Sequence, residues 1–79
     1  MNTPHSTQAL ETNLNQMYGP LLSLPQLAEL LHRSPDGLRV ALRTSQPYAL
    51  QIRQARVKIG RRVYFRTADI ACYLSQAGA

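Results

Sequence analysis

The segment SPDGLRVALR, residues 34–43, is predicted to be a short helix around which the rest of the chain is arranged. Ser34 offers a side-chain oxygen to the first free amide groups of the helix. Pro35 suits the first helical position, because that position needs no amide hydrogen. Asp36 then places a negative charge near the positive end of the helix dipole. The start of this helix is therefore strongly specified.

At 3.6 residues per turn this helix has two unlike faces. The apolar face consists of Leu38, Ala41 and Leu42. The opposite face consists of Asp36, Arg39, Val40 and Arg43. We expect the first face to pack into a core and the second to meet a partner.

Gly37 is unusual in this segment, because glycine costs about 1 kcal/mol relative to alanine inside a helix. One interpretation is simple tolerance near a helix end. The other is that the missing side chain lets the backbone approach a phosphate or another helix. The residues favour neither interpretation.

A second helix is predicted just before, over residues 24–31. Ser23 and Gln26 have the spacing of a capping box, and Pro25 is tolerated in the first turn. Its apolar stripe consists of Leu24, Leu27, Ala28 and Leu31. The tight turn 32–34 joins the two helices, which predicts a helix-turn-helix whose second helix enters a DNA groove.

Basic residues are concentrated in the middle of the chain. The 79 residues carry a net charge of +5, yet the segment 33–66 holds all nine basic residues against one acid, a net charge of +8. Eight of the nine are arginines, which suit phosphates and guanine edges better than lysines do. This distribution favours a nucleic-acid binder over an ordinary solvated surface. The nine are Arg33, Arg39, Arg43, Arg53, Arg56, Lys58, Arg61, Arg62 and Arg66.

Length and composition exclude several classes of protein. A chain of 79 residues forms one small domain, without room for a large active-site cleft. The single cysteine, Cys72, permits no internal disulfide and favours a reducing cytoplasm. No signal sequence or membrane-length apolar run is evident. We therefore expect a soluble cytoplasmic protein with no membrane partner.

Catalytic and metal-binding constellations are not expected. His5 and His32 lack the spacing of metal ligands, and there is no glycine-rich phosphate loop. Ser6, Ser23 and Ser34 are interpreted as caps or loop residues. The sequence thus predicts a protein that is not an enzyme and has no cofactor or metal.

The first 19 residues are predicted to be a tail or a weak amphipathic helix. Residues 1–5 are taken as a disordered lead, and a helix from Ser6 or Thr7 has Leu10, Leu14 and Met17 on one face. Gly19-Pro20 would end it. Such a thin face needs a partner, either the rest of this domain or a second copy of the chain.

The region after residue 44 is predicted to contain a connection, a hairpin and a last helix. Residues 45–54 carry Pro47 and no helical period, which indicates a connection. Alternating residues on either side of Gly60 indicate two strands. A three-residue loop 59–61 would pair Val57 with Val63 and Ala55 with Phe65, separating an apolar face from a basic face. The basic face would carry Arg56, Lys58, Arg62 and Tyr64.

The last helix is predicted to open at Thr67 as its N-cap, with Asp69 in its first turn, and to end at Gly78. Its inward stripe is Ile70, Tyr73 and Leu74. The expected fold is mainly α-helical with a small β-hairpin, in the element order of a winged helix-turn-helix domain spanning residues 20–77.

Two runs carry a family resemblance: LLSLPQLAELLHRSPDGLRVAL, residues 21–42, and VKIGRRVYFRTADIACYL, residues 57–74. They resemble the excisionase and AlpA-like branch of the MerR-type winged-helix proteins. The resemblance implies sequence-dependent binding to duplex DNA at mobile elements, phages or plasmids. It also implies that Arg39 and Arg43 read bases from the helix, and that Lys58, Arg61 and Arg62 contact DNA from the wing. The chain departs from the family in Asp36-Gly37-Leu38 and in a longer link before the wing.

The expected function is sequence-specific binding of double-stranded DNA, by an excisionase-like recombination directionality factor or by a transcriptional regulator of a mobile element. A protein-interaction module with a merely solvated basic face is the alternative. Single-strand or RNA binding through Tyr48, Tyr64 and Tyr73 is a minor one. The expected protein partners are a second copy of the chain on an adjacent DNA site and either a recombinase or RNA polymerase. The expected DNA-binding residues are Arg33, Ser34, Asp36, Gly37, Arg39, Val40, Arg43, Lys58, Gly60, Arg61, Arg62 and Arg66.

Overall fold

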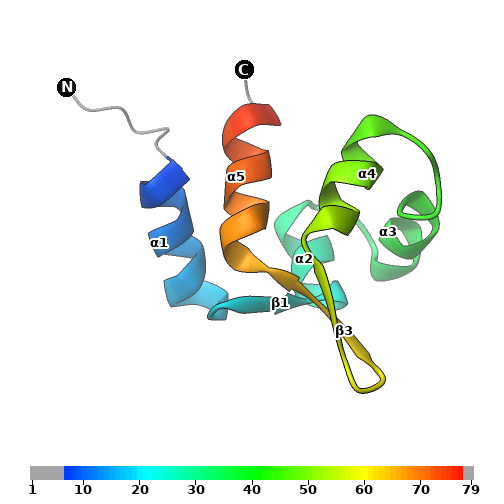
Figure 1. Ribbon diagram of the computed structural model, residues 1–79, viewed down its shortest axis with the longest axis horizontal. Helices are drawn as coiled ribbons and strands as arrows, with labels where there is room; N and C mark the ends of the chain where they lie inside the picture. Colours follow the sequence, from blue (N-terminus) through cyan, green and yellow to red (C-terminus); the bar gives the residue numbers. More distant parts are fainter. Residues whose placement is uncertain (1–6, 78–79) are drawn as a thin grey trace.

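The computed structural model describes residues 7–77, which form five helices and a three-stranded antiparallel sheet (Figure 1). Some sequence predictions concern residues outside this range. They are the disordered lead 1–5, which includes His5, the possible helix start at Ser6, and the end of the last helix at Gly78. The elements are α1 (Thr7–Tyr18), β1 (Leu21–Ser23), α2 (Leu24–Leu30), α3 (Pro35–Ala41), α4 (Pro47–Gln54), β2 (Arg56–Ile59), β3 (Arg62–Arg66) and α5 (Thr67–Ala77).

The core joins nearly all of these elements. Its largest fully buried apolar side chains are Leu22, Leu27, Leu38, Ile52, Phe65 and Ile70, which come from β1, α2, α3, α4, β3 and α5 respectively. The sheet has the order β1-β3-β2, so Leu22 on β1 lies opposite Phe65 on the central strand. Phe65 and Ile70 are therefore core residues, as the sequence predicts.

The predicted helix pair is present, and its capping is confirmed. Ser23 and Gln26 form both hydrogen bonds of the capping box at the start of α2. After α2 the chain reverses at His32, whose φ is 59°. The amide of His32 donates to the carbonyl of Glu29, and that of Arg33 donates to Ala28 at 2.8 Å. This Schellman arrangement fixes the turn into α3.

Residues 47–54 form a helix, α4, so their prediction as a connection is wrong. Pro47 stands at the helix start, where it does not interrupt the backbone hydrogen bonds. Ala49, Ile52 and Ala55 recur every three residues and are all buried. Two of these three are alanines, so the apolar stripe is too weak to be recognised in the sequence.

The hairpin turn also differs from the prediction. The register pairs Ile59 with Arg62 and Val57 with Tyr64, which leaves a two-residue turn of Gly60 and Arg61. Gly60 has a φ of 62°, the positive value that the first central residue of a type II′ turn requires. The three-residue loop is therefore wrong.

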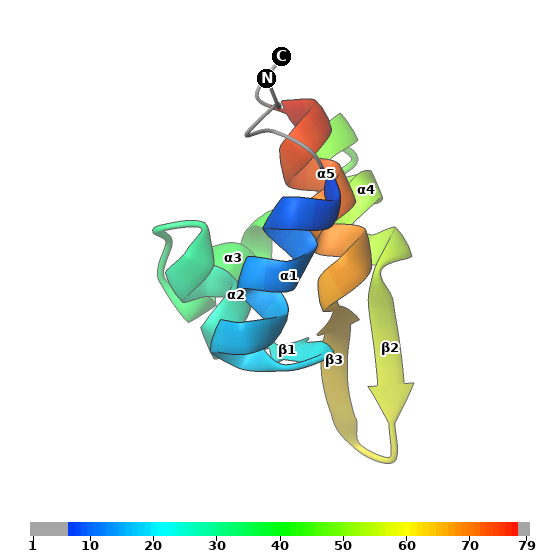
Figure 2. The same ribbon diagram turned by 90° about the vertical axis from the view of Figure 1, so that its left-hand side faces the viewer.

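The faces of the hairpin change with this register. Cross-strand partners share a face. One face therefore consists of Arg56, Lys58, Val63 and Phe65, and the other of Val57, Ile59, Arg62 and Tyr64. The hairpin extends beyond the helices (Figure 2), and Ile59 and Val63 are 52% and 37% exposed. Because water reaches both faces there, no separation of apolar from basic side chains is required.

Helix α1 packs against α5 of the same chain (Figures 1 and 2). Its residue Leu14 is 3% exposed, whereas Met17 is 68% exposed and does not belong to the packed face as predicted. Gly19, at a φ of 87°, ends the helix, and its amide donates to Asn15. Of the two partners left open by the sequence, the chain's own domain is the one that α1 contacts.

Thr67 connects this N-terminal region to α5. Its hydroxyl donates to the carbonyl of Gly19 at 2.7 Å, and its amide donates to that of Pro20 at 3.0 Å. The last helix begins at Thr67, as predicted, but the buried Thr67 hydroxyl bonds the carbonyl of Gly19 and so joins two segments of the chain.

Thr67→Val should lower the free energy of unfolding by about 1–3 kcal/mol, because it leaves the carbonyl of Gly19 without this partner. Thr12→Val is the matched control, since the Thr12 hydroxyl bonds the Gln8 carbonyl on an exposed helix face where water can replace it. The control should change stability by less than about 0.5 kcal/mol. Urea unfolding measures the stability of both variants. Equal small losses of stability would mean that water can replace the Thr67 hydroxyl at the carbonyl of Gly19.

Candidate nucleic-acid interface

The helix predicted over residues 34–43 is shorter in the structure, because α3 ends at Ala41 and Leu42 and Arg43 follow it. The two faces are nevertheless divided as the sequence predicts. Leu38, Ala41 and Leu42 are buried in the core or its edge. Asp36, Arg39, Val40 and Arg43 are exposed, and Val40 is 63% accessible to solvent. An exposed valine between two arginines gives this outer face both donors and an apolar contact, which are the groups that read base edges in a major groove.

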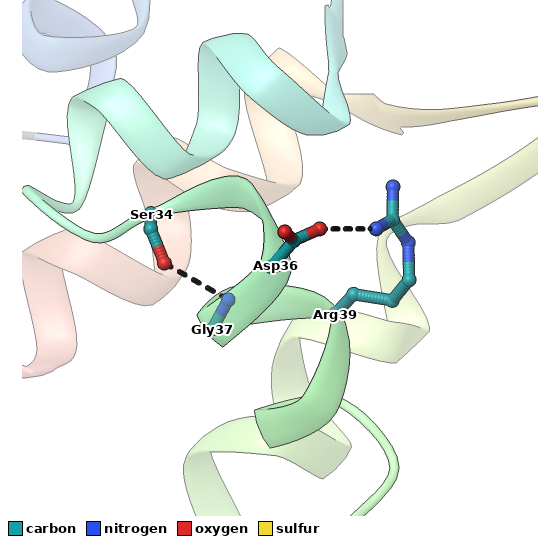
Figure 3. A network of polar contacts seen from close by, with 4 residues as sticks. All are labelled: Ser34, Asp36, Gly37 and Arg39. Carbon is teal, nitrogen blue, oxygen red and sulfur yellow. Dashed lines mark hydrogen bonds and ion pairs between the residues drawn. The ribbon is translucent and has the colours of Figure 1, made fainter.

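A network of polar contacts organises the first turn of α3 (Figure 3). The Ser34 hydroxyl accepts from the amide of Gly37 at 3.0 Å, so the predicted N-cap is present. On another side of the helix, Arg39 Nη1 lies 2.9 Å from Asp36 Oδ1. The Asp36 side chain is 93% exposed and that of Arg39 is 55% exposed.

Gly37 has a structural reason that neither sequence interpretation contains. A Cβ at this position would lie 2.8 Å from Ser34 Oγ. Real Cβ atoms essentially never approach an oxygen so closely, so a side chain here would displace the capping hydroxyl. Glycine therefore makes room for the cap.

The far end of α3 is held by α4. Arg53 Nη1 donates to the carbonyl of Leu42 and, at 2.9 Å, to that of Thr44. A cation at this end also suits the negative end of the helix dipole. Arg53 is part-buried and belongs to the fold, so its charge is not part of the exposed basic surface.

The turn before α3 also contacts α4. The Arg33 guanidinium carbon lies 6.0 Å from the centroid of the Tyr48 ring, and Arg33 Nη1 donates to the Tyr48 hydroxyl at 3.4 Å. Helix α4 therefore contacts the chain on both sides of α3.

A groove separates α3 from the sheet. Its apolar floor is formed by Leu24, Leu42, Val63 and Phe65, and its arginines are Arg39, Arg43 and Arg56. Arg56 was not among the predicted DNA-binding residues. The three-residue loop placed it away from Phe65, whereas the observed register places both on one face. Glycine at the first central position is typical of a two-residue type II′ hairpin turn, and this is the sequence signal that would have found it.

The other predicted residues lie around this groove or apart from it. Lys58, Gly60, Arg61 and Arg62 are exposed along the outer part of the hairpin. Arg62 and Arg39 both line a second hollow, with Ser23, Leu24, Pro25, Val63 and Tyr64. Arg66 lies on the opposite face of β3 from Phe65, with Nη1 3.6 Å from Asp69 of α5. Arg33 stands beside Tyr48, and neither it nor Arg66 lines the groove.

Comparisons with protein-family models, with curated proteins and with solved structures gave no match. Over residues 7–77 no helix combines the length and apolar character needed to cross a membrane. The same residues contain no group of three or more histidine, cysteine, aspartate or glutamate side chains that could hold a metal ion. The interpretation of the basic surface therefore rests on its own geometry and chemistry.

Gly37→Ala should change stability little by itself. Alanine gains about 1 kcal/mol of helix propensity, but displacing the Ser34 hydroxyl costs about 1 kcal/mol of capping. In a Ser34→Ala protein there is no hydroxyl to displace, so the same substitution should stabilise by about 1 kcal/mol. Urea unfolding of the four proteins measures this coupling. Additive effects would show that the hydroxyl moves aside without cost.

Proposed function

We propose that this chain is a non-enzymatic winged helix-turn-helix protein that binds double-stranded DNA sequence-specifically. The outer face of α3 would enter the major groove, and the β2–β3 hairpin would contact the flanking backbone or minor groove. The observation that carries this proposal is the placement of α3 and the hairpin on either side of one groove lined by Arg39, Arg43 and Arg56.

The distribution of charge supports this arrangement. Arg53 is used inside the fold, and Arg66 is near Asp69. The cations left on α3, just after it and on the hairpin are Arg39, Arg43, Arg56, Lys58, Arg61 and Arg62, and Asp36 is the acid among them. Such a surface suits a ligand with regularly spaced negative charges, as the duplex backbone has.

The biological role proposed on the family resemblance is that of a mobile-element protein. It would act either as an excisionase-like recombination directionality factor with a recombinase, or as a regulator of transcription by RNA polymerase. A seven-residue helix is only about 10 Å long and spans few base pairs. Useful specificity would therefore need two or more copies on adjacent sites. An adjacent integrase gene would favour recombination, and a divergent promoter would favour regulation.

Salt dependence tests DNA binding against the alternative of a protein-interaction module. About six phosphate contacts give a slope near −5 when log affinity for a 20-base-pair duplex is plotted against log salt concentration. Binding of the whole chain to a random-sequence duplex is measured by fluorescence anisotropy from about 50 to 200 mM salt. A slope near zero, or no binding at low salt, would overturn the proposal and leave the basic face as a solvated surface.

Arg43→Ala and Arg61→Ala should have different effects. If Arg43 contacts a guanine edge, its loss should reduce the binding free energy by about 1–3 kcal/mol on a selected site and by much less on random DNA. Arg61 is at the hairpin turn, so its loss should weaken both duplexes equally and make the salt slope shallower by about one unit. Equal losses for Arg43→Ala on both duplexes would make α3 a backbone contact, and specificity would then come from the hairpin or DNA shape.

A further inference from the structure

Asp36 is an acid on the surface where the proposed ligand is a polyanion. It is the one acid among residues 33–66, where nine basic residues are found. Its side chain is 93% exposed, so packing does not require it. At 0.1 M salt, charges interact over about 10 Å, so a carboxylate on this face repels any phosphate near α3. In the proposed complex its charge would therefore oppose general affinity for DNA.

Asp36 forms an ion pair with Arg39, which lies three residues and about one turn later on the same side of α3 (Figure 3). The pair uses Nη1 of the guanidinium and leaves the edge formed by Nε and Nη2. That edge can donate two parallel hydrogen bonds to O6 and N7 of guanine. An unpaired arginine is also free to bind a nearby phosphate, which carries no sequence information.

We propose that Asp36 is a positioning and specificity-determining residue: it holds Arg39 for a guanine in the major groove and weakens binding to duplexes that lack this guanine. This inference rests on the proposed DNA binding. Asp36 neutralises Arg39 as a phosphate ligand, so Arg39 contributes to binding mainly when its free edge meets a base. Discrimination then comes from lower affinity for the wrong sequence as well as from contact with the right one.

Asp69 provides a matched control. It is also an acid in the first helical turn, and it also pairs with an arginine three residues away, Arg66, at 3.6 Å. Its side chain is 51% exposed. Asp69→Asn therefore makes the same change in net charge and in helix-dipole interaction as Asp36→Asn, away from α3. Any difference between the two variants reports the position of Asp36.

The experiment begins with the wild-type chain and a pool of random 20-base-pair duplexes, from which an enriched site is selected. Dissociation constants are then measured on that site and on a scrambled duplex of the same composition, across a salt series. Asp36→Asn should tighten binding to the scrambled duplex by about three- to fivefold. It should also steepen the salt slope for that duplex by about 0.9, because Arg39 is freed to bind one phosphate. The ratio of the two constants should fall about tenfold. Asp69→Asn should keep this ratio within about twofold.

Single-base variants of the enriched site separate positioning from general charge. Arg39→Ala should lose preference at one base pair, and Asp36→Asn should relax preference at that same base pair. The double variant Asp36→Asn/Arg39→Ala should lose no more base preference than Arg39→Ala alone, because the two residues act as one unit. Asp36→Glu keeps the charge, so it should keep scrambled affinity near the wild-type value. Asp36→Ala removes the same charge from this 93% exposed side chain, and it takes the place of the asparagine variant if that variant does not fold.

An unchanged ratio for Asp36→Asn, or relaxation at a different base pair, would overturn the role of Asp36 while leaving DNA binding in place. Asp36→Glu binding the scrambled duplex as tightly as Asp36→Asn would also overturn it. If the wild-type chain enriches no site, the proposed function fails and the role of Asp36 fails with it. The enrichment step thus distinguishes the two failures.

Discussion

The basic surface depends on the position of α3, whose end is held by hydrogen bonds from Arg53 to the carbonyl groups of Leu42 and Thr44. Helix α3 has only seven residues, and helices shorter than about 12 residues are marginal in water. It is held at its start by the Ser34 hydroxyl, along its length by the core and at its end by one guanidinium. The position of its outer face therefore depends on its packing against α2 and the core, and on Arg53 of α4, a helix outside the proposed interface.

This dependence explains which parts of the fold could be predicted from the sequence. The caps at Ser23 and Ser34 and the apolar stripe of α3 are local patterns, and each is present as predicted. Helix α4 has a small stripe of Ala49, Ile52 and Ala55, which becomes recognisable only when the core around it is known. Strand β1 has three residues and exists through its pairing with β3, which is distant in sequence. Contacts of this kind leave no local pattern.

The charge of the candidate site could be predicted from the sequence, whereas the positions of its residues could be predicted only in part. The sequence indicates nine basic residues but does not say which are used internally, and Arg53 is one that is. The hairpin register depends on the turn, and the apolar alternation used to predict it applies only where one face is buried. Because the hairpin projects into solvent, that argument does not apply to it, and the prediction placed Arg56 on the wrong face. The sequence likewise does not show that Asp36 forms an ion pair, because this depends on where the Arg39 side chain lies.

The docking of α1 on α5 has a consequence for how the domain can be joined to other sequences. Figures 1 and 2 show that α1 begins and α5 ends at the same end of the molecule, opposite the tip of the β2–β3 hairpin. A fluorescent protein or a second domain attached at either end of the described residues would therefore be joined to the domain at the end far from the hairpin tip. For two copies joined end to end through a flexible linker, the length and composition of the linker would set how far apart the two hairpins reach.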